Sequence, residues 1–306
     1  MTKLLYFEHY NRSHINFYQF NFRKKRILPR FIITLNCKIG LCSFIYNFMI
    51  STVDFSLVNE LSVKAGKAIL EVYYNELYKE NIDYKSDNSP LTIADKISHK
   101  IISEGLQSIN GSIPIISEEG IDIPFDSRSG WDYFWLVDPL DGTKEFIKRN
   151  GEFTVNISLI EKNRPIAGFI YVPVQDLLYF NFPHQSAKKL EGGQEKNIRV
   201  SSKTSALTAI SSRSHGSLSE NNHLIRFPIE RSVTAGSSLK FCYVAEGLAD
   251  IYYREGPTME WDTAAGQSIL EAAGGRMTTL EHKAFIYNKN SLLNPGFICN
   301  GSGITI

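Results

Sequence analysis

Hydrophobic residues recur along the chain in two kinds of pattern, and each predicts a different element of secondary structure. Over residues 53–72 the apolar positions return every three or four residues, which is typical of a helix with one buried face. A second helical pattern covers 94–106 and follows Thr92, a residue type that caps helix N-termini. A third, rich in alanine, runs from Asp262 to Ala273. Two glycines come next, which indicates that the helix ends there.

Unbroken apolar runs predict the strands. Tyr133–Val137 is apolar throughout and stops at Asp138, the pattern of a buried strand that ends abruptly. Other strands are expected at 113–116, 153–160, 166–172, 177–182, 209–210 and 249–253, with a short helix at 239–244 and a polar loop at 121–132. Because strands and helices alternate on both sides of residue 200, the pattern predicts a layered α/β protein. It would have two sheet-containing halves, 53–200 and 201–306, in one body.

Composition narrows the class of protein. The 306 residues are 43% hydrophobic and 21% charged, with a net charge of +1, which is the balance of an ordinary globular protein. Near-neutral charge argues against a nucleic acid polymer as partner. Four cysteines without paired spacing (Cys37, Cys42, Cys242 and Cys299) indicate neither a zinc site nor a disulfide framework, and they fit a reducing compartment such as the cytoplasm.

Residues 1–52 differ from the rest of the chain. They carry eight lysines or arginines and a single acid, and the apolar run 31–50 is interrupted by Asn36, Lys38 and Asn47. Three interpretations stay open. The segment could precede a true start at Met49, or it could be a basic, aromatic element that lies on the cytoplasmic side of the inner membrane. It could also be a membrane span or a targeting sequence.

The stretch 135–143 carries the first chemical signal. A buried strand would deliver Asp138 to an exposed end, and Pro139 would prevent the chain from pairing on as a central strand. Asp141 follows three residues later, Gly142 permits close backbone approach, and Thr143 opens a helix whose free N–H groups favour an anion. Carboxylates for a hard cation beside amides for an anion suit a metal-dependent phosphate enzyme. The alternative is an Asx turn with an N-cap.

Other acids lie at the ends of predicted elements. Glu118 and Glu119 follow a short strand, Asp262 stands at the start of a helix, and Asp95 lies three residues after Thr92. Taken singly, Asp262 reads as an N-cap and Asp95 as a first-turn acid. Four such sites in one chain favour a shared cleft.

Together, Glu118-Glu119, the run Asp138-Pro-Leu-Asp-Gly-Thr143 and Trp261-Asp262 resemble the inositol monophosphatase superfamily of magnesium-dependent, lithium-sensitive phosphatases. The segments 85–90, 141–154, 236–241 and 294–297 are similar to its bacterial 3'(2'),5'-bisphosphate nucleotidase branch. The resemblance covers about 53–300. It implies a layered αβαβα sugar-phosphatase fold and hydrolysis of the 3'-phosphate of adenosine 3',5'-bisphosphate to AMP and phosphate, in support of sulfate assimilation.

The resemblance also implies roles for individual residues. Two or more Mg²⁺ ions would be held by acidic side chains and one carbonyl group: Glu118, Asp138, Leu140 (carbonyl), Asp141 and Asp262. Asp95 and Thr143 would deprotonate and orient the attacking water. Substrate contacts would come from Glu118, Gly142, Thr143, Ser237, Lys240, Arg254 and Asp262, and the phosphate that is not cleaved would bind at Ser237, Lys240 and Arg254.

The sequence alone leaves alternatives open for individual residues and for the function. Lys240 and Arg254 could be solvated surface charges, although a simple monophosphate would not need two added cations. Cys242 lies in an apolar stretch and is expected in the core. The same scaffold could serve an inositol or sugar monophosphate phosphatase, or a non-catalytic nucleotide-binding protein. The oligomeric state is open.

Overall fold

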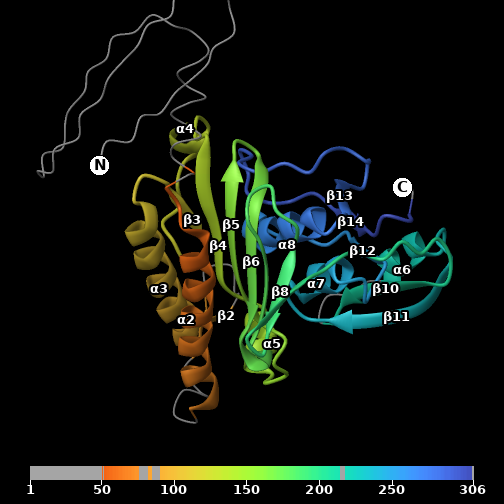
Figure 1. The fold of residues 1–306 in the computed structure, drawn as a ribbon, viewed down its shortest axis with the longest axis horizontal. Helices are drawn as coiled ribbons and strands as arrows, with labels where there is room; N and C mark the ends of the chain where they lie inside the picture. Colours follow the sequence, from red (N-terminus) through yellow and green to blue (C-terminus); the bar gives the residue numbers. More distant parts are fainter. Residues whose placement is uncertain (1–49, 51, 76–81, 85–89, 214–217, 305–306) are drawn as a thin grey trace, which may run out of the picture. The chain divides into compact units, whose positions relative to one another are not determined.

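The computed structural model describes residues 50, 52–75, 82–84, 90–213 and 218–304 (Figure 1). Met49–Ile306 form one compact unit. The predicted basic extension 1–52 lies outside the described residues apart from Ile50 and Thr52, and so does most of the motif 85–90. Among the described helices, none combines the length and the apolar character that a membrane crossing requires.

Two long helices lie side by side and form the first layer. α2 (Phe55–Tyr74) begins at Asp54, which accepts a hydrogen bond from the Ser56 N–H at 3.0 Å, and its buried face follows the predicted apolar stripe. α3 (Ile93–Asn110) begins at Thr92 as predicted, with a capping box completed by Asp95. The two helices pack on each other and on β4, β5 and β6 (Figure 1). The amphipathic patterns therefore predicted both helices and their buried faces.

A seven-stranded sheet forms the second layer. Its strands follow one another in chain order: β3 (Ile115–Ser117), β4 (Tyr133–Asp141), β5 (Thr154–Glu161), β6 (Arg164–Val172), β7 (Leu177–Asn181), β8 (Lys188–Glu191) and β9 (Gln194–Asn197). β3 pairs with β4 in parallel, and every later pair is antiparallel. A separate hairpin of β1 (Ile82–Tyr84) and β2 (Pro90–Thr92) leads into α3.

β4 continues past the point where the sequence predicted its end. Asp138 lies opposite Asn156 and Asp141 lies opposite Thr154, so β4 uses three steps where β5 uses two. The extra residue is a β-bulge that contains Pro139, which has no N–H to give to a ladder. Proline therefore did not end the strand; it was accommodated in an irregular segment.

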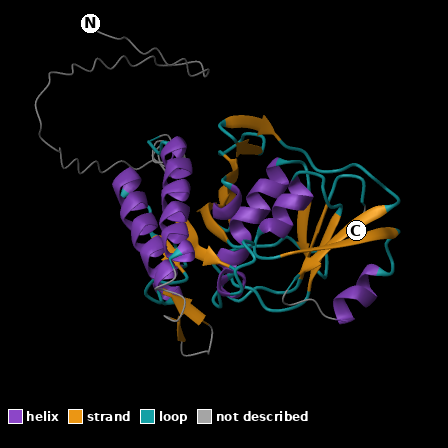
Figure 2. Ribbon diagram, turned by 90° about the horizontal axis from the view of Figure 1, so that it is seen from below, coloured by secondary structure: helices purple, strands orange, loops and turns teal. Residues whose placement is uncertain are grey.

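A five-stranded sheet forms the fourth layer. Its strands are arranged in the order β11 (Ile229–Ala235), β10 (Leu207–Ser212), β12 (Ile251–Arg254), β14 (Phe297–Asn300) and β13 (Arg276–Thr279). The third layer contains α7 (Leu239–Ala245) and α8 (Glu260–Ala272). α8 contacts strands of both sheets, and α7 contacts strands of the smaller sheet. α6 (Leu218–Leu224) packs on β12 (Figure 1). It supplies Leu224 to a second small core. Figure 2 shows the helices and strands of these layers from below. The order αβαβα is the predicted architecture.

The main hydrophobic core lies between the two sheets and surrounds α8. Cys242 and Cys299 are both fully buried in it, which confirms the expectation for Cys242. α8 is followed by Gly274 with φ +90°, the left-handed conformation that the paired glycines predicted. The helix begins at Glu260, two residues earlier than predicted.

Short and exposed elements were not predicted from the sequence. The loop 121–132 contains one helical turn, α4 (Phe125–Arg128). By contrast, the predicted helix that opens at Thr143 is confirmed as α5 (Thr143–Ile147). A single 3-10 turn, η2 (Pro173–Gln175), separates β6 from β7. The hairpin β8–β9, the helix α6 and the strands β11, β13 and β14 had no sequence-based expectation.

Candidate active site

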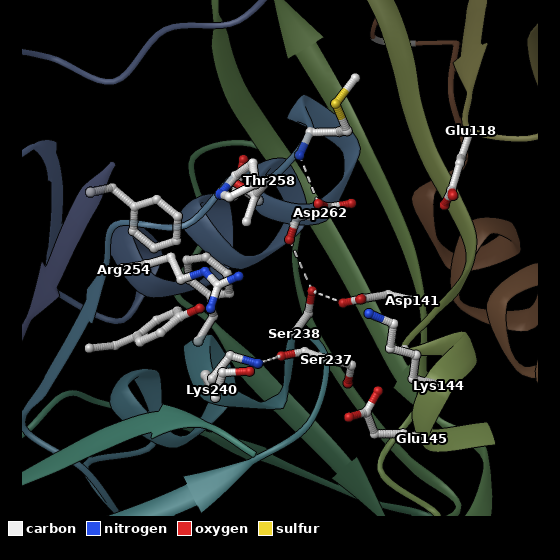
Figure 3. Close-up of a pocket in the computed structure, with 18 of the residues that line it drawn as sticks. Glu118, Asp141, Lys144, Glu145, Ser237, Ser238, Lys240, Arg254, Thr258 and Asp262 are labelled. Carbon is white, nitrogen blue, oxygen red and sulfur yellow. Dashed lines mark hydrogen bonds between the residues drawn. The ribbon is translucent and has the colours of Figure 1, made fainter. Parts of the chain in front are cut away.

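A cavity of about 530 Å³ opens where β4, β12 and the N-terminal ends of α5, α7 and α8 meet (Figure 3). Eight of the eleven predicted site residues line it: Glu118, Asp141, Gly142, Thr143, Ser237, Lys240, Arg254 and Asp262. The other three, Asp95, Asp138 and Leu140, are buried and are not among the residues that line it. Residues more than 140 positions apart in the sequence are thereby brought to one cleft.

Asp138 is the most deeply placed acid, with 1% of its surface exposed. The expectation that it lies at an exposed strand end is wrong, because β4 continues for three residues beyond it. Its side chain accepts a hydrogen bond from the Leu140 N–H at 3.1 Å. Burial raises its pKa well above the usual range, and the negative charge of Glu118 is the next largest cause. Such a group calls for positive charge in the cleft.

Asp141 is held by two side chains from different layers. Ser238 donates to its Oδ2 at 2.6 Å, and Asn156 donates to the same oxygen at 3.3 Å. Burial raises the pKa of Asp141, while the Lys240 charge and these two hydrogen bonds act in the opposite direction. Its orientation is therefore fixed by the seven-stranded sheet and by α7 together.

Asp262 does not cap α8 as its own N-cap residue. Met259 occupies that position, and the Asp262 Oδ2 accepts a hydrogen bond from the Met259 N–H at 2.7 Å. The prediction that Asp262 is the N-cap is therefore wrong. Asp262 lies three residues after the N-cap, in the first turn of α8, and its side chain points back to the N-cap backbone. Burial raises the pKa of Asp262 well above its usual range, and the negative charge of Asp141 is the next largest cause.

Asp95 and Thr143, predicted as a pair, are in contact. The Thr143 hydroxyl lies 3.4 Å from the Asp95 Oδ1 and 3.5 Å from the Leu140 carbonyl oxygen. The other Asp95 oxygen accepts from both the N–H and the hydroxyl of Thr92, at 2.8 and 2.5 Å. Burial raises the pKa of Asp95 to about 6, against the lowering effect of these bonds. The first-turn role and the role at the cleft are compatible, since each uses a different oxygen.

Lys240 and Arg254 occupy the opposite end of the cleft (Figure 3). They are only 6% and 7% exposed, so the interpretation as solvated surface charges is wrong. The Lys240 ammonium donates to the Ser237 carbonyl group, and the Arg254 guanidinium lies 3.7 Å from Glu220. Burial lowers the pKa of Lys240 to about 8, although Asp141 acts in the opposite direction. Two buried cations side by side make this end receptive to an anion.

Two tight turns join the two ends. Gly142 has φ +89° and Ser237 has φ +43°, and a side chain at Gly142 would meet the Ser237 Cβ at 3.2 Å. The Ser237 hydroxyl is buried and has no hydrogen-bond partner among the described residues. A buried hydroxyl without a partner is costly unless a ligand satisfies it. Its position beside Lys240 matches the predicted anion contact.

The donor set fits a hard divalent cation by its chemistry. Carboxylate and carbonyl oxygens are the ligands that Mg²⁺ takes, usually one or two carboxylates together with water and substrate phosphates. The pKa shifts of Asp138 and Asp262 show that acids here lie close enough to raise each other's pKa. Within the part of the chain that the structure describes, no three acidic, histidine or cysteine side chains stand ready at metal-binding distances. Water and phosphate oxygens would therefore complete any coordination sphere.

Several residues that support the site were not among the predicted site residues. Ser238 and Asn156, which hold Asp141, also contact each other at 2.8 Å across 82 residues. Asn294 donates to the Met259 carbonyl oxygen at 2.6 Å and so fixes the turn before Asp262. Asn294 and Ser238 lie in the segments 294–297 and 236–241 that the resemblance singled out, whereas the local pattern around Asn156 gave no hint of its role.

Comparisons with known proteins agree with this geometry. The model of the Inositol monophosphatase family matches residues 51–302. A protein of Escherichia coli (strain K12) named 3'(2'),5'-bisphosphate nucleotidase CysQ is 45% identical over 242 residues, covering 78% of this chain and 96% of that protein. The crystal structure of CysQ from Bacteroides thetaiotaomicron, described as a bacterial member of the inositol monophosphatase family, superposes with a TM-score of 0.73 at 38% identity. It covers 85% of this chain and 100% of that one.

A more distant structure shares the fold alone. Inositol monophosphatase from Anabaena (Nostoc) superposes with a TM-score of 0.65 at 22% identity, covering 85% of this chain and 93% of that one. The predicted αβαβα architecture is therefore that of a known group of proteins.

Proposed function

Because the chain belongs to the inositol monophosphatase family, we propose that it is a magnesium-dependent 3'(2'),5'-bisphosphate nucleotidase. It would hydrolyse the 3'-phosphate of adenosine 3',5'-bisphosphate and release AMP and phosphate. The observation that carries this proposal is the division of one cleft into an acidic end and a cationic end. A substrate with two phosphates can use both, one at the acids through metal ions and one at Lys240 and Arg254.

The cationic end supports a bisphosphate over a monophosphate. Lys240 offers a point charge, Arg254 offers a planar fork of donors, and the Ser237 hydroxyl offers a third contact. All three are buried, so water screens them little. Arg254 lies 3.7 Å from the buried Glu220, and a second phosphate group would add a further anion to this pair of cations.

Two or more Mg²⁺ ions would be held by Glu118, Asp138, Asp141, Asp262 and the Leu140 carbonyl oxygen. When bound, they would polarise the phosphoryl oxygens and stabilise the leaving alkoxide. The acids of the chain supply the negative charge that keeps them in place. Glu118 and Asp262 line the cavity and would also contact the substrate.

The protein's own side chains would move the proton. Asp95 would accept the proton that the attacking water loses, since its pKa of about 6 lies close to neutrality. The Thr143 hydroxyl, between Asp95 and the Leu140 carbonyl, would orient that water. Gly142 and Thr143 would present backbone N–H groups to the phosphate at the start of α5. This arrangement supports a direct displacement by water.

Phosphate release from a small panel of substrates tests the proposal. We expect adenosine 3',5'-bisphosphate to be hydrolysed in Mg²⁺ much faster than inositol 1-phosphate, with no turnover in EDTA. We also expect inhibition by millimolar Li⁺, a property that the family resemblance implies. Faster hydrolysis of inositol 1-phosphate would identify a sugar monophosphate phosphatase instead. Absence of turnover with every substrate would indicate a non-catalytic binding protein.

The cellular setting belongs to the same proposal. A small-molecule nucleotide as substrate fits a cytoplasmic enzyme that recycles the by-product of sulfate assimilation. The basic charge of residues 1–52 supports peripheral contact with the anionic inner face of the inner membrane.

A further inference from the structure

Glu152 joins three segments that meet beside the cleft. It follows α5, and its backbone carbonyl oxygen lies against Gly142 on one side and Gly236 on the other. A Cβ atom at Gly236 would come within 2.6 Å of that oxygen, and one at Gly142 within 3.2 Å. Both glycines therefore allow the turn after β4 and the turn before α7 to close on Glu152.

The Glu152 carboxylate adds polar contacts to this packing. Its Oε2 accepts a hydrogen bond from the Gly236 N–H at 2.7 Å. Arg213, at the end of β10, donates to Oε2 from Nε and to Oε1 from Nη2, each at 2.6 Å. Arg213 also donates to the Thr234 carbonyl oxygen on β11 at 3.2 Å. A bidentate pair of this kind fixes orientation as well as distance.

These contacts connect the two ends of the cleft. Gly142 directly follows Asp141 of the acidic end, and Gly236 directly precedes Ser237 of the cationic end. Glu152 touches both turns, while Arg213 ties it to the smaller sheet. Glu152 therefore lies at a junction between the turn of the acidic end and the turn of the cationic end.

We infer that Glu152, oriented by Arg213, is a positioning residue that sets the spacing between the two phosphate sites and so determines specificity for a bisphosphate. The inference rests on the proposed function. Neither side chain lines the cavity, so neither is a catalytic residue. A shift of about 1 Å between two binding sites is enough to weaken a substrate that must reach both. A substrate that occupies only one of the two sites should bind equally well after that shift.

The test compares a bisphosphate with a monophosphate. Glu152→Ala should raise the KM for adenosine 3',5'-bisphosphate about tenfold, with kcat changed less than about twofold. Hydrolysis of adenosine 3'-monophosphate should change less than about twofold. Arg213→Ala should act in the same direction but less strongly, because the Glu152 carboxylate still accepts its hydrogen bond from the Gly236 N–H. Glu152→Gln retains an acceptor oxygen and should restore part of the loss.

A matched control is available in Arg164, which pairs with Glu271 at 3.0 Å on another surface. Arg164 and Arg213 are similarly exposed, at 47% and 43% of their side chains. Arg164→Ala should change neither substrate. An equal fall for both substrates in Glu152→Ala and Arg213→Ala, or no change in either, would overturn the inference. If Glu152→Ala does not fold, Arg213→Ala decides the question alone. A wild-type enzyme that shows no preference for the bisphosphate would instead contradict the proposed function.

Discussion

The two ends of the cleft are built in opposite ways. At the acidic end, Asp138 and Asp141 lie on a central strand of the larger sheet, and burial raises the pKa of each. At the cationic end, Lys240 lies on α7 and Arg254 on β12, and burial lowers the pKa of Lys240. One end is therefore dominated by buried acids and the other by two buried cations with Glu220 at 3.7 Å from Arg254, so that each end can take a ligand of opposite charge.

The difference indicates what each end contributes. Carboxylates that raise one another's pKa hold cations strongly, because the ions relieve both burial and repulsion. Lys240 and Arg254 also repel each other, but Asp141 and Glu220 act on them as counter-charges, and we expect the two cations to take part in recognition alone. We expect changes at the acidic end to remove activity for every substrate, and changes at the cationic end to affect only substrates with a second phosphate.

The largest effect is expected for Asp138→Asn. It should lower kcat by roughly three powers of ten or more, beyond the ~10²–10³ typical of losing one oxyanion donor. Because the substitution keeps the shape and removes one of several repelling charges, the melting temperature of the metal-free protein should stay the same or rise. Phosphate release in saturating Mg²⁺ and thermal unfolding in EDTA measure the two quantities.

A matched control is Asp250→Asn, since Asp250 is similarly buried at 2% exposure and accepts a hydrogen bond from the Thr208 N–H away from the cleft. It should retain activity. Near-normal turnover in Asp138→Asn would contradict the metal-binding role of the acidic end.

The double variant Lys240→Ala, Arg254→Ala tests the other end. Each lost charge-assisted contact should cost roughly 1.5–3 kcal/mol, or about one to two powers of ten in kcat/KM for adenosine 3',5'-bisphosphate. A monophosphate substrate should be hydrolysed almost as before. Steady-state kinetics with both substrates give the ratio, and an equal fall for both would mean that these residues serve folding or the reaction itself.

The protonation of Lys240 should give a smaller effect. With a pKa of about 8, this ammonium is charged at neutral pH and loses its charge as the pH rises through 8. The kcat/KM for the bisphosphate, corrected by that of a monophosphate at each pH, should fall about tenfold between pH 7 and 9. Lys240→Arg keeps its charge over this range and should abolish the dependence. A flat ratio in the wild-type enzyme would show that Lys240 is not in contact with the second phosphate.

The smallest effect is expected for removal of residues 1–48. Met49–Ile306 form one compact unit, and the family match begins at residue 51. We therefore expect kcat/KM to change less than about twofold at either end of the cleft. Fractionation of cells that express the full and the shortened chain tests membrane contact, which should be lost with the segment.

The sequence predicted the parts of the fold that are strongly patterned. The apolar run 133–137 became the first five residues of the buried strand β4, and Thr92 with Asp95 became a capping box. Strand β11 was missed because it is largely exposed and lacks an apolar face, and the hairpin β8–β9 was missed because its residues are mostly charged or polar. Pairing with neighbours, rather than a hydrophobic pattern, defines these strands.

The site divides in a similar way. Short motifs of consecutive positions located Lys240 and most of the acids, whereas the role of Arg254 came from the family resemblance alone. The contact between Asn156 and Ser238 could not be foreseen, since two different layers must pack before the two side chains meet. The depth of Asp138 was misjudged for a related reason: local sequence does not tell whether a strand continues through a proline.

The bulge in β4 determines on which face of the sheet Asp138 and Asp141 lie. Side chains alternate along a regular strand, so two residues three positions apart face opposite sides of a sheet. The additional residue of the bulge brings the two acids to the same face. Asp138 lies opposite Asn156 and Asp141 lies opposite Thr154, and these two partners are two positions apart on β5. The Thr154 hydroxyl donates a hydrogen bond to the Asn156 side chain at 2.9 Å. Both acids consequently lie on the same face of the sheet. An inserted residue between them would keep every chemical group of the pair and still turn one of them to the far side. Outside the two acids, this short stretch should accordingly tolerate side-chain substitution better than an insertion.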